Sequence, residues 1–334
     1  MRFLLGVDYE LFFGEPTGTP DRCMLEPTSR LLDVLERHGA RLTAFVDVAY
    51  LERLLTYGSA HRRDFEAIAS QLRTLIDRGH DVQLHIHPHW LDSEWAGDRW
   101  IINTQRYRLH DLSDAEVAEV VPRLVSLLGD ITGRAPVAYR AGGWCLQPFE
   151  RLSPALAEAG VRIDSTVYAE GYSANPGREF DFRGSPQRDC WQFDLDPLVP
   201  DIDGTFWEVP ISTVRVPPWF YWRMVYRKLR PSTCGRSFGD GQSLGGSGSY
   251  YARKLTRFEQ SVASIDGARA RLLGRARAEQ RGRGGQLLNV MGHPKALTHD
   301  SLLQLDRFLA RYGREFEYHT FASLAEALSS APDR

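Results

Sequence analysis

Three histidines stand close together in residues 83–90. Neutral imidazole is a frequent zinc ligand, so the cluster of His85, His87 and His89 predicts a metal site. His85 and His89 are one helical turn apart, but Pro88 biases the residue before it toward an extended backbone. On a strand, His85 and His87 would instead share one face. The residues alone therefore leave two candidate pairs of ligands open, and hydrogen-bonded histidines without a metal are the alternative.

Two acidic residues, Asp8 and Glu10, follow a short apolar run near the start of the chain. Alternation along a strand places both on the same side, close enough to share one site. Two imidazoles and one carboxylate make a three-ligand site with open coordination positions, as catalytic zinc requires. The second carboxylate would then be free to act as a base. Taken alone, such acids are as often helix caps or solvated loop residues.

Further polar residues follow other apolar runs. His293 ends a late run, where a protonated imidazole could donate to a leaving amine, although a single histidine is usually structural. Arg140 precedes a double glycine and Trp144, in a pattern that otherwise suits a surface turn. We interpret Arg140 as orienting a carboxylate by a bidentate contact, with Asp164 as a candidate partner.

The elements that must position these residues alternate between apolar runs and helical periodicity. This β-α order favours a parallel sheet, in which the carboxyl ends of the strands share one rim. We predict a distorted (β/α) barrel, with helices on both faces of an open sheet as the alternative. Expected strands cover 3–7, 42–46, 81–86, 137–139, 161–163, 286–290 and 316–319, and expected helices cover 27–38, 65–78, 113–128, 148–159, 301–312 and 321–328.

One stretch, at about 170–280, breaks this regularity and is rich in Gly, Pro, Ser and aromatic residues. It holds one clear strand signal, at 206–210, and a Gly/Ser-rich tract at 235–249 that we predict to be mobile. We read residues 1–334 as a single barrel domain, and this stretch as an insertion that covers the barrel mouth. Residues 217–228 mix large aromatics with basic residues, which suits a helix packed on the barrel or contact with a membrane surface.

The composition is that of an ordinary soluble protein, with 43% hydrophobic and 25% charged residues among 334. The net charge of −2 gives no global field that favours nucleic acid. Four scattered cysteines without a C-x-x-C pair indicate neither a structural zinc site nor a disulfide framework. The first apolar run, 3–7, is too short for a signal peptide or a membrane span, so we expect a cytoplasmic protein without a transmembrane segment.

Taken together, the motifs resemble the polysaccharide deacetylases with NodB homology, carbohydrate esterase family 4. They occur in the family's order and span residues 6 to 295. The family's usual Thr-Phe-Asp-Asp-Gly is absent, and His87 is an addition that could replace His89 as a ligand. The matching segments are Asp8-Tyr9-Glu10, His85 with His89, Tyr139-Arg140-Ala141, Asp164-Ser165-Thr166-Val167 and Met291-Gly292-His293.

The resemblance implies a distorted (β/α) barrel and one divalent metal, usually zinc, although related sites accept cobalt or nickel. It implies a role for each matching residue. Asp8 would be the catalytic base and His293 the general acid. Arg140 and Asp164 would set the positions and pKa values of that base and acid. The implied metal ligands are Glu10, His85 and His89.

We therefore predict a metal-dependent carbohydrate N-deacetylase acting on a surface polysaccharide of O-antigen or capsule type, or on its precursor, which could be lipid-linked. The alternatives are a deformylase or cyclic amidohydrolase on the same metal site, a non-catalytic glycan-binding protein and, more weakly, a metallophosphatase. The oligomeric state is left open. The candidate substrate-binding residues are Tyr9, His87, Trp90 and Trp144.

Overall fold

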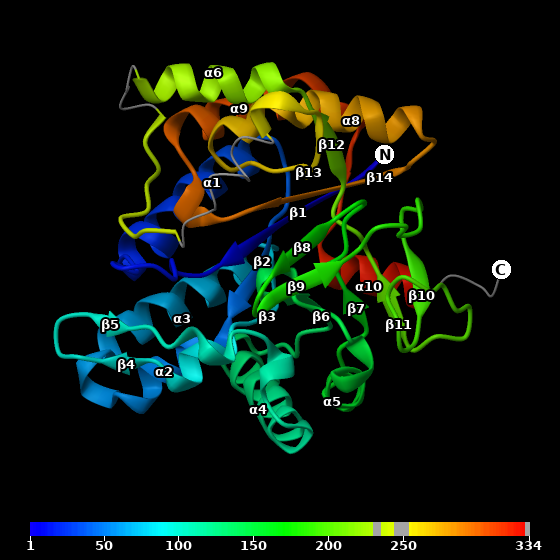
Figure 1. The fold of residues 1–334 in the computed structure, drawn as a ribbon. Helices are drawn as coiled ribbons and strands as arrows, with labels where there is room; N and C mark the ends of the chain where they lie inside the picture. The colour runs from blue at the N-terminus through cyan, green and yellow to red at the C-terminus, as the bar shows by residue number, and fades with distance from the viewer. Residues whose placement is uncertain (230–234, 244–253, 331–334) are drawn as a thin grey trace.

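A curled nine-stranded sheet forms the centre of the molecule (Figure 1). The computed structural model describes residues 1–229, 235–243 and 254–330. All strand pairs of this sheet are parallel except β10 with β11, so the predicted parallel sheet is confirmed. The order across the sheet is β10 (Trp191–Phe193), β11 (Phe206–Glu208), β7 (Ile163–Asp164), β6 (Ala138–Ala141), β3 (Asp81–Ile86), β2 (Thr43–Asp47), β1 (Arg2–Tyr9) and β14 (Leu287–Gly292), and β15 (Glu317–Tyr318) also pairs with β1.

Irregular segments, not a strand ladder, bridge the gap between the β7–β11 end of the sheet and β14. The backbone N–H of Ser212 donates to the carbonyl of Asn289 at 2.9 Å, and that of Met291 donates to Ala263 at 3.0 Å. The buried side-chain amide of Asn289 also donates to the Val209 carbonyl at 3.1 Å. The fold is therefore the predicted distorted barrel, in which side chains and loops replace part of the sheet.

Helices cover the outside of the sheet, and successive helices pack against one another. Helix α4 begins at the expected capping box, in which Ser113 and Glu116 bond each other's backbone N–H groups. Helix α2 was not predicted. None of the described helices is long and apolar enough to cross a lipid bilayer. The helices around the barrel are α1 (Glu26–Arg37), α2 (Val48–Thr56), α3 (Arg62–Asp77), α4 (Asp114–Thr132), α5 (Ser153–Glu158), α8 (Leu273–Gly282), α9 (His299–Tyr312) and α10 (Phe321–Ser329).

The stretch at 170–280 contains more regular structure than we predicted. It includes two antiparallel pairs of short strands. One pair is a local hairpin, and the other joins segments 213–216 and 259–262, which are far apart in the sequence. Such pairing leaves little local periodicity to detect. Residues 244–249 of the predicted mobile tract lie outside the described residues. The elements are the hairpin β8 (Tyr172–Asn175) with β9 (Arg178–Asp181), the pair β12 (Thr213–Val216) with β13 (Glu259–Val262), and helix α6 (Pro218–Leu229).

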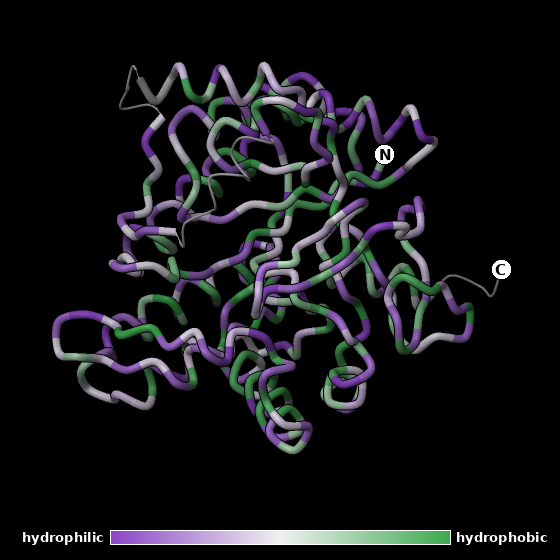
Figure 2. The backbone as a smooth tube through the Cα atoms, viewed as in Figure 1, coloured by the Kyte–Doolittle hydropathy of each residue, from purple (hydrophilic) through white to green (hydrophobic). Residues whose placement is uncertain are grey.

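Alternation along β1 separates the barrel interior from the layer of helices. Phe3, Leu5 and Val7 belong to the large core that includes the helices. Leu4 belongs to a separate core inside the barrel, which α10 closes at one end. Two residues further along the same face, Gly6 leaves room for the guanidinium of Arg140, because a Cβ atom there would lie 2.8 Å from its Nη2. Figure 2 shows hydrophobic stretches along the central strands.

Candidate active site

A cavity of about 340 Å³ lies at the carboxyl ends of the barrel strands. Side chains at the ends of β1, β3 and β14 reach the cavity, because alternation along a strand turns every second side chain into the barrel. Most of its lining side chains are charged or aromatic, and they come from distant parts of the chain. They include Asp8, Glu10, Phe12, Phe13, His85, His87, Tyr107, Trp144, Arg178, Asp266, His293 and Lys295.

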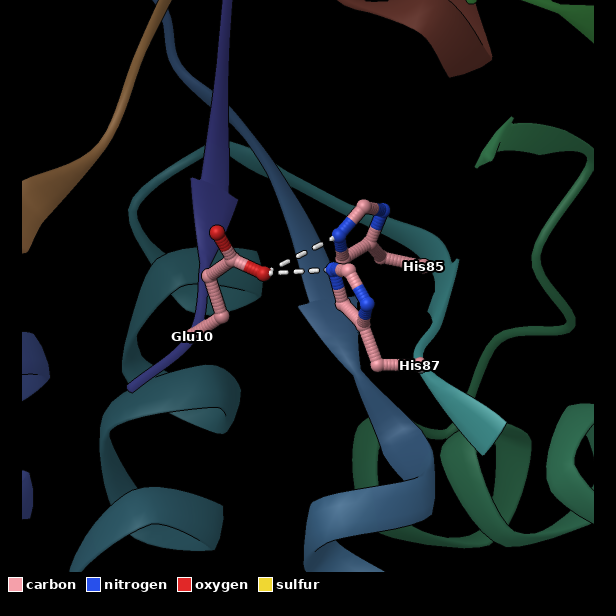
Figure 3. Close-up of side chains that lie close together, drawn as sticks. All are labelled: Glu10, His85 and His87. Atoms are coloured by element: carbon pink, nitrogen blue, oxygen red, sulfur yellow. Dashed lines mark hydrogen bonds and ion pairs between the residues drawn. The ribbon is translucent and has the colours of Figure 1, made fainter. Parts of the chain in front are cut away.

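Glu10, His85 and His87 form a buried group whose ligand atoms all lie within 4.8 Å of one another. Glu10 Oε2 is 2.9 Å from His87 Nε2 and 3.3 Å from His85 Nε2, so both rings face the same carboxylate oxygen (Figure 3). Nδ1 of His85 lies 2.7 Å from the backbone carbonyl of Arg140. That contact requires the hydrogen on Nδ1, which leaves the Nε2 lone pair for a metal ion.

The charge states of this group suit a divalent metal. Burial would raise the pKa of Glu10, but the charge of Lys295 and the contacts with His87 and His85 hold that pKa well below its usual value. Burial lowers the pKa of His87 to about 4. Burial also opposes a charge on His85, but its hydrogen bond to Glu10 and the nearby Asp8 raise its pKa to about 9. One carboxylate and two imidazoles fit zinc, whose binding would displace the proton of His85.

His89 does not join this group. A short 3₁₀ helix, Pro88–Asp92, begins directly after His87 and turns the chain away from the strand direction. The His89 ring is fully buried and lies parallel to Tyr107 at a centroid distance of 5.8 Å, and neither ring nitrogen has a hydrogen-bond partner among the described residues. The structure therefore assembles the alternative pair, His85 and His87, because only these two keep the alternation of the strand.

Asp8 lies beside the metal-binding group, on the same face of β1. Its Oδ1 accepts a hydrogen bond from Arg140 Nη1 at 2.8 Å, and its Oδ2 lies 3.5 Å from His293 Nε2. Arg140 is completely buried, and its Nε donates to the Ser165 carbonyl at 2.8 Å. Arg140 thus holds the Asp8 carboxylate in one orientation, as we expected of an arginine that orients an acid.

Asp266 is a residue that sequence reasoning missed, and it contacts both the backbone and the ring of His293. Its Oδ1 accepts the backbone N–H of His293, and its Oδ2 lies 2.8 Å from His293 Nδ1. Burial opposes a charge on His293, but Asp266, together with Asp8 and Glu10, raises the pKa of the imidazole. Asp266 stands in the irregular stretch, where no strand pattern indicated that it would reach the site.

Asp164 does not line the cavity, and its hydrogen bonds within the described residues go to groups other than Arg140. On β7 it has the opposite parity to Ser165, so its side chain leaves the barrel interior and accepts hydrogen bonds from the backbone and side chain of Thr166. Its partner in the strand register is Glu208 on β11, which accepts the backbone N–H of Val167. Burial raises the pKa of Asp164, and burial together with the neighbouring Asp164 raises the pKa of Glu208 well above its usual value.

Lys295 also escaped sequence reasoning, although it stands two residues after His293. Its buried Nζ donates to Glu10 Oε1 at 2.9 Å and to the Leu11 carbonyl at 2.6 Å. Nζ also lies 4.6 Å from the ring centroid of Phe13. Lys295 therefore occupies one oxygen of Glu10 and leaves the other to the two histidines.

The aromatic candidates divide into one that lines the cavity and two that do not. Trp144 lines it. Trp90 has no exposed surface and packs on Tyr50 at a centroid distance of 4.6 Å, so it offers no stacking face to a sugar. Tyr9 faces the helices, where its hydroxyl donates to Gln71 at 2.7 Å. Its parity on β1 is opposite to that of Asp8 and Glu10, which explains the difference.

Comparison with known proteins finds similar folds among solved structures and no match at the level of the sequence. No family model matches the sequence, and no curated protein matches it. A protein described as a polysaccharide deacetylase from Mycobacterium smegmatis is similar in structure, with a TM-score of 0.50, 18% identity and coverage of 99% of this chain and 93% of that one. The allantoinase Puue gives a TM-score of 0.52 with 12% identity, and covers 100% of this chain and 91% of its own.

A family 4 carbohydrate esterase from Streptomyces lividans matches with a TM-score of 0.36 and 13% identity, covering 95% of this chain and 90% of that chain. The match to the Mycobacterium smegmatis protein confirms the resemblance to the NodB-type deacetylases at the level of the fold. At these identities the likeness identifies the barrel, and the chemistry has to be argued from the site itself.

Proposed function

We propose that this protein is a metal-dependent carbohydrate N-deacetylase. The observation that supports this most directly is the arrangement of three groups around one cavity. Glu10, His85 and His87 form a ligand set, Asp8 is held by a buried arginine, and His293 is held by an aspartate. A hydrolase that cleaves an amide needs an electrophile, a base and an acid, and these groups can supply one each.

The metal would be held by Glu10, His85 and His87. When bound, it supplies Lewis acidity for an amide carbonyl and for water. Asp8 accepts the proton of the attacking water through Oδ2, because Arg140 already occupies Oδ1. The buried arginine holds Asp8 in a fixed orientation, which is what a base in the cavity needs.

His293 has the position and charge of a general acid. Its Nε2 faces Asp8 at 3.5 Å, while Nδ1 is engaged by Asp266 at 2.8 Å. The Nδ1 contact fixes the ring, so that the proton on Nε2 is the one available to a leaving nitrogen. The nearby acids raise the pKa of His293, which favours the protonated form that a general acid needs.

The substrate we propose is an N-acetylated sugar of a surface polysaccharide of O-antigen or capsule type, or of its precursor. Trp144 lines the cavity and suits stacking on a sugar ring. The ion pairs Arg140–Asp8 and His293–Asp266 support an enzyme over a non-catalytic glycan-binding protein, because such a protein needs neither an oriented base nor an oriented acid.

The test is metal analysis of the purified protein together with release of acetate from N-acetylated oligosaccharides. We expect about one zinc-like ion per chain and metal-dependent acetate release. A chain that binds no divalent metal even after reconstitution would refute the proposal. Activity that survives complete removal of the metal would refute it equally.

A cyclic amidohydrolase is the second candidate, and it is supported by the site more than by the fold shared with an allantoinase. The same three groups could open a cyclic amide, because that reaction also needs a polarised carbonyl and a protonated leaving nitrogen. Ring-opened product from a cyclic amide, without acetate or formate release from acylated sugars, would select this function. Formate in place of acetate would identify a deformylase.

A further inference from the structure

Helix α6 has one side packed on the molecule and one side in solvent. Phe220 and Tyr221 are buried, and the Tyr221 hydroxyl donates to Glu259 Oε2 at 2.7 Å. Trp219, Trp222 and Tyr226 follow the spacing of one helical face and are 60%, 56% and 54% exposed. The helix therefore packs on the barrel as the sequence allowed, but its largest aromatic rings remain outside.

The exposed rings continue onto the next segment of the described chain. The Trp222 indole donates to the Leu255 carbonyl at 2.9 Å, which joins α6 to the residues before β13. Phe258 in that segment is 54% exposed, and the guanidinium of Arg215 lies 4.2 Å from its ring centroid. Five of the twelve exposed large hydrophobic side chains of the described residues gather here, and we name them the α6 face: Trp219, Trp222, Val225, Tyr226 and Phe258.

Basic residues predominate in the sequence around the α6 face, although Glu259 accepts a hydrogen bond from Tyr221 and Glu279 accepts one from the backbone N–H of Arg215. Residues 209–239 contain no Asp or Glu and six basic residues, although the whole chain has a net charge of −2. Arg223 is exposed between the aromatic positions of α6, and it forms no ion pair within the described residues. In Figure 1, α6 runs along the upper edge of the molecule, on its outside. Large aromatics beside arginines are the composition of helices that lie in a bilayer interface.

We propose that the α6 face docks on an anionic lipid bilayer, with its aromatic rings at the headgroup level and Arg223 against the lipid phosphates. A second copy of the chain fits less well. A symmetric contact would bring the two basic stretches together, with no carboxylate from 209–239 to offset them. A bilayer with anionic lipids supplies the missing negative charge and accepts the apolar rings.

Flotation of the full-length protein with vesicles tests the proposal. The vesicles are phosphatidylcholine alone, or phosphatidylcholine mixed with phosphatidylglycerol, at low and at physiological salt. We expect flotation with the anionic vesicles, roughly tenfold weaker binding to the neutral ones, and weaker binding as salt rises. Quenching of tryptophan fluorescence by brominated lipids gives a second measurement, because it reports rings at membrane depth.

Two variants and one matched control sharpen the result. Trp219→Ser and Arg223→Glu should each weaken flotation about tenfold without a change in the unfolding midpoint, because both side chains are exposed. Ile202→Ser removes an apolar side chain that is 71% exposed elsewhere, and it should float like the wild type. No flotation of the wild type, equal flotation of all variants, or a dimer that Trp219→Ser dissociates would each overturn the proposal.

Discussion

Two carboxylates at the end of β1, two positions apart, face the same cavity in different surroundings. Both oxygens of Glu10 are engaged, Oε2 by two imidazoles and Oε1 by Lys295. Asp8 has one oxygen on Arg140, and the other lies 3.5 Å from His293. A fully engaged carboxylate suits a metal ligand, whereas one with an oxygen open to the cavity suits a base. Neighbours, more than residue type, therefore separate the two roles.

The largest expected effect comes from the two histidines of the metal-binding group, and His89 serves as their control. His85→Ala should lose the metal and all metal-dependent activity, because it removes one of three ligands. His87→Ala should do the same. His89→Ala is the matched control and should keep about one metal ion per chain, which elemental analysis measures. Loss of metal in His89→Ala with retention in His87→Ala would restore the His85–His89 pair.

Asp8→Asn tests the base side. We expect the variant to keep its metal and to lose about a thousandfold in kcat, because an amide cannot accept the proton of water. Metal content and steady-state kinetics of acetate release measure the two effects separately. Asp164→Asn is the control on the outer face of β7, and its kcat should stay within about tenfold of the wild type. A fully active Asp8→Asn would remove Asp8 from the mechanism.

Asp266→Asn tests the acid by its pH dependence. Asp266 holds the pKa of His293 above its usual value, and the acid works in its protonated form. Activity should therefore fall as pH rises through that pKa. Without Asp266 the alkaline limb of kcat should move to lower pH by about one unit. Asp240 lies away from His293 and accepts hydrogen bonds from Thr19. Asp240→Asn should therefore leave the alkaline limb of kcat at the same pH.

Lys295→Met should give the smallest effect, and it acts on the Glu10 side alone. Lys295 is the first of the charges that hold the pKa of Glu10 down against burial. Its removal raises that pKa, so protons compete with the metal at higher pH. Metal content measured on stepwise acidification should show loss about one pH unit earlier than in the wild type. An unchanged profile would mean that Lys295 does not control the charge of Glu10.

Much of the barrel could be predicted from the sequence because its elements are locally periodic. The strand at 81–86 has the predicted bounds, and α4 begins at its predicted capping box. The stretch at 170–280 was less predictable, since β12 and β13 are short and pair across more than forty residues. That stretch carries Asp266, so the partner of His293 was missed together with the element that delivers it.

The sequence by itself determined which residues share a face, because strand alternation is a local property. It placed Asp8 with Glu10, and it allowed His85 to share a face with His87. Only the tertiary structure decided between His87 and His89, since that depends on where β3 ends and the 3₁₀ helix begins. Only the fold, too, brought Lys295 to Glu10 and Asp266 to His293, because contacts between distant segments follow from packing and leave no local pattern.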